Sequence, residues 1–362
     1  MLTTLDAPTP KYRQLALRFQ RQIAAGELAP GDRLPSFVQL HREFGATQKT
    51  VEKAFDLLQG QGLIERRNGS GVYVRSARRA FVRTGLIGLV SAGTRAKQRA
   101  PIWAHLLDAV CEAAAARERR VVLLDDESAL GWDGVEGVLV ADYRTEQALR
   151  HRPVALPCVS LLHSAPDCFN ALSDERVAGR LATEHLLGLG HERIAFLHLE
   201  NDPISARRVQ GWRSALEERG SAPRPSWERT YRNLSDDELA GEDAHIGSAR
   251  LALRAWLEDD FEATALLCQN DDAALGALAA LREGGRRVPR DVSLVGFDGL
   301  ETGERAFPRL SSVRASIEAI AATGVERLLG HIEGATPVAT TVLFAPRLIV
   351  RDSTASPHDA PP

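Results

Sequence analysis

The sequence predicts a multidomain protein in which a small N-terminal winged helix-turn-helix precedes a larger, two-lobed α/β region built on parallel sheets. Three observations predict this fold class. Residues 31–74 read as two helices followed by a hairpin. From residue 85 onward, continuous apolar strands alternate with helices. The length of 362 residues also suits two or three domains, at about 150 residues per domain.

The composition is that of an ordinary globular protein with a sizeable core, because 44% of the residues are hydrophobic and 26% are charged. No run of about 18 apolar residues is present, and the N-terminus shows no apolar signal region. The four cysteines are far apart, without a Cys-x-x-Cys pair. We therefore expect a cytoplasmic protein without a membrane segment, whose cysteines are buried, reduced thiols.

The net charge of −3 hides an asymmetry along the chain. Residues 1–80 hold 13 Lys and Arg against 7 Asp and Glu, whereas the remainder holds 32 against 41. A basic head on an acidic body suggests that the head alone meets a polyanion. Small domains vary in charge by chance, so this balance is weak evidence when taken alone.

The first predicted element is a helix that follows a disordered stretch, residues 1–8. Thr9 can cap this helix, Pro10 suits its first position, and it runs to about residue 25. Its buried stripe repeats at helical spacing and consists of Tyr12, Leu15, Phe19 and Ile23.

Two further helices and a tight turn come next. Ser36 can cap the first of them with its hydroxyl, and Gly45 begins the turn. Thr47 caps the second helix, and Gly62 ends it where a left-handed C-cap is favoured. The two helices share an apolar seam of Leu40, Phe44, Val51, Phe55 and Leu58. The outward face near the start of the second helix holds Gln48, Lys49, Glu52 and Lys53.

A hairpin completes the head. Residues 63–66 and 71–74 read as strands, and residues 67–70 form a basic, glycine-rich tip between them. Two helices and a hairpin in this order are the plan of a winged helix-turn-helix, which lays its second helix in the DNA major groove.

The runs GELAPGDRLPS, FGATQKTVEKAFDLL and GLIERRNGSGVYV closely resemble the DNA-binding domain of GntR-type bacterial regulators over residues 11–75. The resemblance implies a DNA-binding domain in residues 1–75. This family often has arginines where Val38, Gln48 and Glu52 stand here, which leaves the operator sequence open. The residues expected to contact DNA are Ser36, Thr47, Gln48, Lys49, Thr50, Lys53, Arg66, Arg67, Asn68 and Gly69.

A basic linker, residues 76–84, joins the head to the body. It can be a solvated connector, or its arginines can contact DNA phosphates and release counterions. The two interpretations are equally good at this point.

The body alternates strands with helices. The expected strands are residues 85–90, 121–124, 137–140, 159–162, 194–197, 265–268 and 293–296. The expected helices are residues 101–117, 181–189, 206–219, 247–257, 273–283 and 317–329. Continuous apolar strands separated by helices indicate parallel sheets covered on both faces. Two such series imply two lobes with a cleft between them.

Five segments of the body resemble the effector domain of the lac and galactose repressor family, which is similar to periplasmic sugar-binding proteins. They are LATEHLLGLGHERIAFL, SARRVQGWRSAL, CQNDDAALGAL, VPRDVSLVGFDG and PRLIVRDST. The resemblance implies an effector-binding and dimerisation domain over residues 85–354. A chain with a GntR-type head followed by such an effector domain is similar in domain order to the arabinose repressor.

Two features of the body fall outside that resemblance. Residues 355–362 read as a disordered tail. In residues 125–136 a loop stands where the family has a helix, and in the family this lobe contributes to subunit pairing. The dimer contact can therefore differ in this chain.

Candidate ligand contacts follow the expected strands, because open α/β lobes bind ligands at the carboxyl ends of their strands. By resemblance, the family's sugar contacts map onto Arg208, Asn270, Asp272 and Asp298. Their guanidinium, amide and carboxylate groups can hydrogen-bond vicinal hydroxyls. The alternative is that Asn270 and Asp298 only cap turns and helices. Trp103 can stack on a sugar ring, or equally be a core or hinge aromatic.

Other kinds of site are disfavoured. The histidines and cysteines lack zinc spacing, and no G-x-S-x-G elbow is present. Some GntR-type heads precede a pyridoxal-phosphate enzyme, but Lys97 is the only lysine after residue 53 and reads as a loop residue. We therefore expect no catalytic residue, no metal and no cofactor.

The sequence thus favours a ligand-responsive transcriptional regulator, a repressor, controlled by a small molecule in the interlobe cleft. The expected partners are operator DNA, a sugar or sugar derivative as effector, and a second copy in a homodimer, without a membrane. The alternative is a DNA-binding regulator with a vestigial or non-sugar effector cleft. The identity of the effector, the operator and the sign of regulation stay open.

Overall fold

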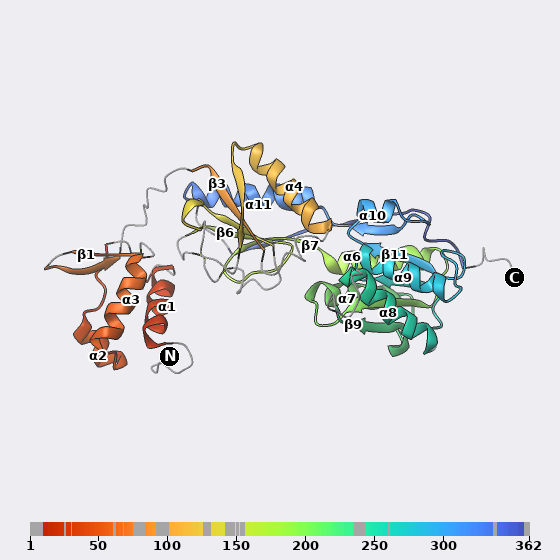
Figure 1. The fold of residues 1–362 in the computed structure, drawn as a ribbon, viewed down its shortest axis with the longest axis horizontal. Helices are drawn as coiled ribbons and strands as arrows, with labels where there is room; N and C mark the ends of the chain where they lie inside the picture. The colour runs from red at the N-terminus through yellow and green to blue at the C-terminus, as the bar shows by residue number, and fades with distance from the viewer. Residues whose placement is uncertain are drawn as a thin grey trace.

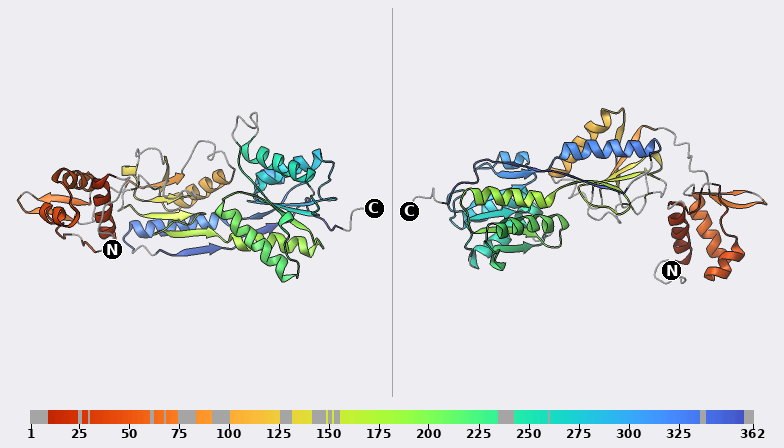
Figure 2. Two further views of the ribbon diagram at one scale, coloured as in Figure 1. Left: turned by 90° about the horizontal axis from the view of Figure 1, so that it is seen from below. Right: turned by 180° about the vertical axis from the view of Figure 1, so that it is seen from behind.

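The computed structural model describes residues 10–24, 27–29, 31–60, 63–67, 69–74, 84–91, 101–125, 132–141, 149, 152, 156–234, 243–259, 261–335 and 339–357. Figure 1 shows a head, a first lobe and a second lobe following one another along the longest axis of the molecule. The two views of Figure 2 show the same succession from below and from behind.

The head holds three helices and a two-stranded antiparallel wing. Its elements are α1 (Lys11–Ala24), α2 (Phe37–Phe44), α3 (Gln48–Gly60), β1 (Ile64–Arg67) and β2 (Gly71–Val74). The predicted cap and turn of α2 are confirmed: Ser36 forms a capping box with Gln39, and Gly45 ends α2 with a φ of 59°. The hydroxyl of Thr47 accepts a hydrogen bond from the Thr50 amide at 3.3 Å, as expected of an N-cap.

One apolar core holds the head together. It contains Leu15 and Phe19 from α1, Leu40 from α2, and Val51 and Phe55 from α3. These side chains are the predicted helical stripes, so the amphipathic pattern explains why the three helices pack together.

The first lobe is built on a fully parallel sheet with the strand order β4-β3-β5-β6-β7-β13. The bounds are β3 (Leu86–Ser91), β4 (Arg120–Asp125), β5 (Val138–Val140), β6 (Cys158–Leu161), β7 (Phe169–Ser173) and β13 (Thr341–Phe344). Two helices that are distant in sequence, α4 (Pro101–Ala115) and α11 (Ile317–Ile332), lie side by side over one face of the sheet (Figure 1).

The second lobe is built on a sheet with the strand order β14-β12-β11-β10-β8-β9, parallel except for the β12–β14 pair. The strand bounds are β8 (Ile194–Leu199), β9 (Glu228–Tyr231), β10 (Ala265–Cys268), β11 (Ser293–Phe297), β12 (Ser311–Arg314) and β14 (Arg347–Ile349). The helices are α6 (Glu175–Gly188), α7 (Pro203–Glu218), α8 (Ala244–Glu258), α9 (Asp271–Glu283) and the short α10 (Glu301–Glu304). The pair α6 and α7 covers one face, and α8 and α9 cover the other.

The chain crosses between the lobes three times. It leaves the first lobe after β7, returns after β12 to form α11 and β13, and enters the second lobe again as β14. Three covalent connections thus join the two α/β units at one boundary, an arrangement typical of a hinge. The two units themselves are as the sequence predicted from its two strand–helix series.

Several strands escaped the sequence-based prediction. They are β7, β9, β12, β13 and β14. The outer strands β13 and β14 alternate exposed and partly buried residues instead of forming an apolar run, and β12 begins with buried serines. Helix α6 begins at Glu175 and not at residue 181, because Asp174 caps it and its charged first turns break the apolar pattern.

Some predictions fall on residues outside the described ranges. They include Gly62, Asn68, the linker 76–83, Lys97 and most of the loop that replaces a helix in residues 125–136. The described end of that loop is a 3-10 turn, Trp132–Gly134, whose Trp132 is buried in the first lobe. The first residue of the predicted tail, Ala355, is hydrogen-bonded to His191 and Ser293. No helix in the described part of the chain is both long and apolar enough to cross a bilayer.

Candidate functional site

A cavity of about 160 Å³ lies where the two lobes meet. Its apolar side comes from the first lobe and the hinge, through Ile102, Leu162 and Ile317. Its polar side comes almost wholly from the second lobe, through Glu175, Asp202, Arg208, Gln269, Asn270 and Asp298. Gln269 and Asn270 follow β10 and Asp298 follows β11, so the cavity lies at the carboxyl ends of the strands, where ligands bind in this architecture.

Arg208 is the centre of the polar side. Its side chain is only 8% exposed, and its Nε donates to Oε2 of Glu175 at 2.6 Å. Its Nη1 donates to the backbone carbonyl of Gln269, and its Nη2 lies 4.0 Å from Oδ1 of Asp298. The guanidinium also lies 4.4 Å from the ring centroid of Phe297. Arg208 therefore ties together α6, the end of β10 and the end of β11.

Asp298 has a strained backbone conformation and a buried carboxyl group. Its φ is +107°, a conformation that non-glycine residues rarely adopt and that concentrates at functional sites. Burial raises the pKa of its carboxyl well above the ordinary value, and Arg208 opposes that rise. For Arg208, burial acts to lower the pKa, but Glu175 and Asp298 outweigh it and the pKa is raised. The guanidinium therefore stays charged between two carboxyl groups.

Asn270 has two roles in the structure. Its side chain accepts a hydrogen bond from the Ala273 amide at 2.8 Å, which caps α9, and it also lines the cavity. The next residue, Asp271, is fully buried beneath the site, where it accepts from the Ser312 hydroxyl at 2.6 Å and the Leu300 amide at 2.7 Å. Burial is the main cause that raises the pKa of Asp271 to about 7. Asp271 thereby connects the loop after Asp298 to the strand β12.

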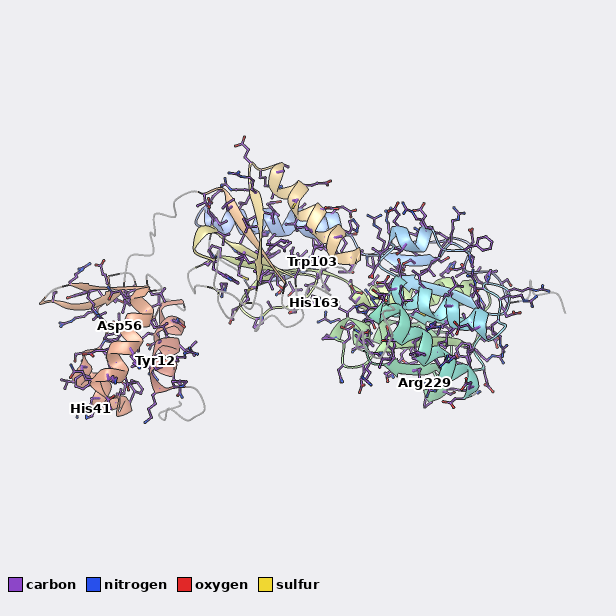
Figure 3. The ribbon with its side chains drawn as sticks, viewed as in Figure 1. Tyr12, His41, Asp56, Trp103, His163 and Arg229 are labelled. Carbon is purple, nitrogen blue, oxygen red and sulfur yellow. The ribbon has the colours of Figure 1, made fainter. Side chains whose placement is uncertain are left out.

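Two of the predicted ligand contacts lie apart from the cavity. Trp103 is buried in the core of the first lobe, and its neighbour Ile102 lines the cavity instead. Asp272 is 9% exposed on α9, where its charged neighbours are His245 and Asp243. Figure 3 shows Trp103 and His163 at the end of the first lobe that faces the second. The structure thus brings Arg208, Asn270 and Asp298 together and leaves Trp103 and Asp272 outside.

Sequence reasoning missed four polar residues of the cavity: Glu175, Asp202, Gln269 and His163. Gln269 directly precedes the predicted contact Asn270, and Asp202 caps the helix that carries Arg208. Both were visible as polar residues just beyond strand ends. Glu175 follows a strand that the sequence did not reveal, β7, so its position at a strand end was hidden.

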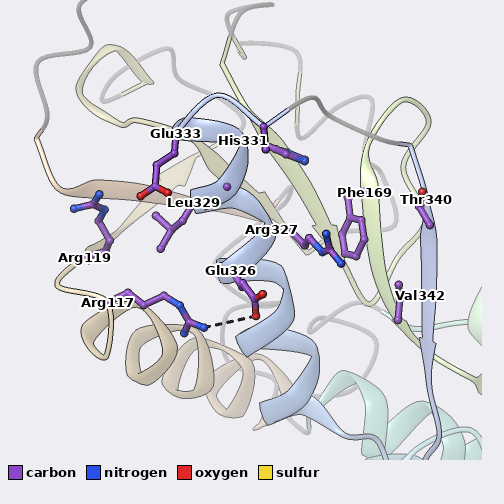
Figure 4. Close-up of a pocket in the computed structure, with 12 residues that line it drawn as sticks. Arg117, Arg119, Phe169, Glu326, Arg327, Leu329, His331, Glu333, Thr340 and Val342 are labelled. Carbon is purple, nitrogen blue, oxygen red and sulfur yellow. Dashed lines mark ion pairs between the residues drawn. The ribbon is translucent and has the colours of Figure 1, made fainter.

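A larger hollow of about 690 Å³ lies at the opposite end of the first lobe (Figure 4). It is lined by the end of α11 and by the starts of β7 and β13, including Arg327, Phe169 and Thr340. Arg117 and Glu326 face each other across it at 3.7 Å. This end of the sheet holds the amino ends of the strands, whereas the smaller cavity lies at the carboxyl ends, where ligands bind in this architecture. Among the described residues, no three His, Cys, Asp or Glu side chains gather to hold a metal.

The head has a hollow of its own, of about 570 Å³, between the start of α2, the outer face of α3 and the wing. Its wall includes the predicted DNA contacts Ser36, Gln48 and Arg66. These three elements are the ones that a winged helix presents to DNA. We refer to this surface as the head hollow.

The predicted DNA contacts differ in how firmly they are held. Gln48 donates to Glu52 at 2.9 Å, and Arg66 pairs with Asp56 at 2.6 Å. Arg67 pairs with Glu65 at 2.8 Å. Lys49 is exposed, and Lys53 lies 5.7 Å from the Tyr12 ring centroid. The hydroxyls of Thr47 and Thr50 share a hydrogen bond. Gly69 turns the wing tip with a φ of +71°.

Two family descriptions match the chain. "Bacterial regulatory proteins, gntR family" matches residues 11–74, and "Periplasmic binding protein-like domain" matches residues 183–354. The head is thus similar to the gntR family, and the body is similar to periplasmic binding protein-like domains. The body match begins within α6 and covers the second lobe together with the segments that return to the first.

Two of the relatives that match the chain are named as transcriptional regulators. The HTH-type transcriptional regulator GalS of Salmonella typhimurium is 34% identical over 186 residues, and the match spans 50% of this chain and 51% of that protein. The chain thus spans about half the length of this relative. The arabinose metabolism transcriptional repressor of Geobacillus stearothermophilus is 24% identical, with 95% of this chain and 98% of that protein covered.

A solved structure adds the fold of the effector body. The "transcriptional regulator CelR-cellobiose complex" superposes with a TM-score of 0.66 and 25% identity, covering 85% of this chain and 91% of that one. The family of the head match, this repressor and this solved structure are all described as regulators.

Proposed function

We propose that this protein is a cytoplasmic transcriptional repressor that binds operator DNA through its gntR-family head and releases it when a small sugar enters the interlobe cavity. One observation carries the proposal: Glu175, Arg208, Asn270 and Asp298 converge on a cavity that the first lobe closes. The head supplies a DNA-reading surface, and the body supplies a site whose occupancy changes how the lobes meet.

The chemistry of the cavity supports a polyhydroxylated ligand. Carboxylate, guanidinium and amide groups on one wall can bond adjacent hydroxyls, and the aliphatic side chains Ile102, Leu162 and Ile317 suit the apolar face of a sugar ring. The volume of about 160 Å³ favours a ligand smaller than the drug-sized molecules that fill about 300–1,000 Å³. A monosaccharide or a close derivative is the class that fits.

The mechanism follows from the hinge. A ligand that contacts both walls favours the closed arrangement of the lobes, because it binds that arrangement more tightly. In a homodimer, a change in the angle between lobes changes the spacing of two heads on a pseudo-palindromic operator. The ligand thereby weakens DNA binding without touching the head.

Titration of the full chain with a labelled promoter fragment tests the proposal. We expect binding that weakens steeply as salt increases, because the basic head displaces counterions. Adding the correct member of a panel of monosaccharides should release the DNA. Absence of salt-dependent DNA binding would contradict the proposal.

Thermal unfolding with the same panel tests the effector cavity separately. A sugar that occupies the cavity raises the melting temperature, because it binds only the folded chain. If DNA is bound and no sugar raises the melting temperature, the protein is a regulator with a vestigial or non-sugar cleft.

A further inference from the structure

The head hollow contains carboxylates on the face that would meet DNA. Gln48, Glu52 and Asp56 recur every four residues along α3, so their side chains form one outward stripe that lines the hollow. DNA is a polyanion, and an acidic side chain on this surface is repelled by its phosphates. Each carboxylate in the stripe therefore calls for a physical explanation.

The two acids have different surroundings. Asp56 receives a hydrogen bond from Arg66 at 2.6 Å, so a cation on the wing neutralises it. Glu52 receives its hydrogen bond from the neutral amide of Gln48 at 2.9 Å. Within the described ranges of the head, no cationic group lies within ion-pair distance of Glu52. Glu52 is exposed, and its carboxylate is held by the Gln48 amide through this one hydrogen bond.

We propose that Glu52, oriented by Gln48, is a specificity-determining residue that accepts a hydrogen bond from the N4 amino group of cytosine in the major groove. The proposal rests on the proposed DNA-binding function and names one base that this surface selects. At sites that carry cytosine, the contact would offset the repulsion between the carboxylate and the phosphates. At other sites the contact cannot form, and the repulsion remains.

The major-groove edges of the four bases explain the choice of cytosine. A carboxylate can only accept hydrogen bonds. Guanine presents two acceptors and thymine presents one acceptor and a methyl group, so both leave the carboxylate unpaired. Adenine presents a donor beside the N7 acceptor, which repels a carboxylate placed to reach both. Cytosine presents the amino donor without that adjacent acceptor.

Selection from a pool of random duplexes, with the full chain, tests this assignment. The variants are Glu52→Ala and Glu52→Gln, and the matched control is Glu43→Gln. Glu43 is an exposed acid on α2 that pairs with Arg18 at 3.5 Å and does not line the head hollow. The control removes the same charge from the head. Circular dichroism and thermal melts establish that each variant is folded.

We expect the wild-type chain and Glu43→Gln to select cytosine at one position in each half-site. Glu52→Ala should lose that preference by about tenfold or more, and Glu52→Gln should admit adenine there, because an amide can pair with both groups of adenine. If Glu52→Ala keeps the wild-type preference, or binds all sequences more tightly without changing it, the assignment is overturned.

The same selection separates this inference from the proposed function. A wild-type chain that enriches a half-site without a cytosine position dependent on Glu52 is a DNA-binding regulator for which only the assignment of Glu52 fails. A wild-type chain that enriches no sequence overturns both.

Discussion

At the scale of single residues, Arg208 shows how one side chain can organise a binding site. It is buried between Glu175 and Asp298, and its remaining bonds reach the end of β10. A charge in such a place is stable only while its partners remain. The arrangement prepares hydrogen-bonding groups before a ligand arrives, which lowers the cost of ordering them on binding.

Replacing Arg208 by alanine should destabilise the folded chain by about 3–5 kcal/mol, because Glu175 is left as a buried, uncompensated carboxylate. Urea unfolding measures the loss. The double variant Arg208→Met with Glu175→Leu removes both charges and should recover most of the stability. Equal losses in the single and double variants would contradict this account of the pair.

Asp271 gives a prediction in pH. Its pKa is raised from the ordinary value of 3.8 to about 7, so the folded chain favours the protonated form. Between these values the folded state binds the extra proton, and stability falls as the pH rises. Relative to Asp271→Asn, the free energy of unfolding of the wild-type chain should fall by up to about 1.4 kcal/mol per pH unit between about pH 4 and pH 7. Above pH 7 the difference should level off. Denaturant unfolding at each pH measures this. A difference in the free energy of unfolding between the two proteins that stays constant from pH 4 to pH 7 would contradict the prediction.

Family resemblance together with strand ends predicted part of the cavity. It missed Gln269, although this residue directly follows the predicted strand β10, and it missed Glu175, which follows an unpredicted strand. Arg208, Asn270 and Asp298 were found because they lie in segments that resemble the lac and galactose repressor family. Asn270 and Asp298 also come just after β10 and β11, which are continuous apolar runs. Glu175, which the sequence did not select, follows β7, a strand that was not predicted. Trp103 was ambiguous from the start, since an aromatic at a helix start serves a core and a binding site equally well.

At the scale of elements, the second lobe depends on helices that approach unusually closely. A Cβ added at Gly211 on α7 would lie 2.0 Å from the Arg176 carbonyl oxygen on α6, and one at Gly179 would lie 2.0 Å from the Arg208 carbonyl oxygen. These reciprocal glycines allow the two backbones to touch. They also fix the position of Arg208 relative to Glu175. Arg208 itself lies against Gly179, and Glu175 directly precedes Arg176, which lies against Gly211.

Gly211→Ala should therefore destabilise the protein by roughly 2 kcal/mol or more, since the helices must separate to accept the methyl group. Gly188, near the end of α6, has no atom within 4 Å of an added Cβ. Gly188→Ala should be neutral or stabilising by up to about 1 kcal/mol, as expected for a helical glycine. Denaturant unfolding of both variants checks the contrast, and similar effects at the two sites would count against close packing as the cause.

Elements with a strong internal period were predictable, and those defined by their neighbours were not. The stripe of α1 and the seam of α2 and α3 identified the head, because an amphipathic helix carries its period in its own sequence. The strand β12 is short and begins with two serines, and its buried position is set by β11 and by the Ser353 contact with Ser311. Nothing within the strand itself signals that environment.

At the scale of the whole molecule, the head and the interlobe cavity are separate sites on one chain. If a sugar weakens operator binding, operator DNA must weaken sugar binding by the same factor, because the two equilibria are linked. Calorimetric titration of sugar with and without a saturating operator duplex should show this factor, expected at about 5–150-fold. A duplex of scrambled sequence serves as the control. A sugar affinity that does not change with operator would exclude coupling.

The return of the chain to the first lobe has a consequence for synthesis on the ribosome. The head is a continuous segment that ends at Val74, so it can fold as soon as it emerges. The first lobe cannot follow it, because α11 and β13 contribute to that lobe from near the end of the chain. The second lobe, almost all of which lies between Glu175 and Arg314, emerges complete except for β14 and the contacts of Ser353 and Ala355. The nascent protein thus completes its winged-helix head first and its interlobe cavity last.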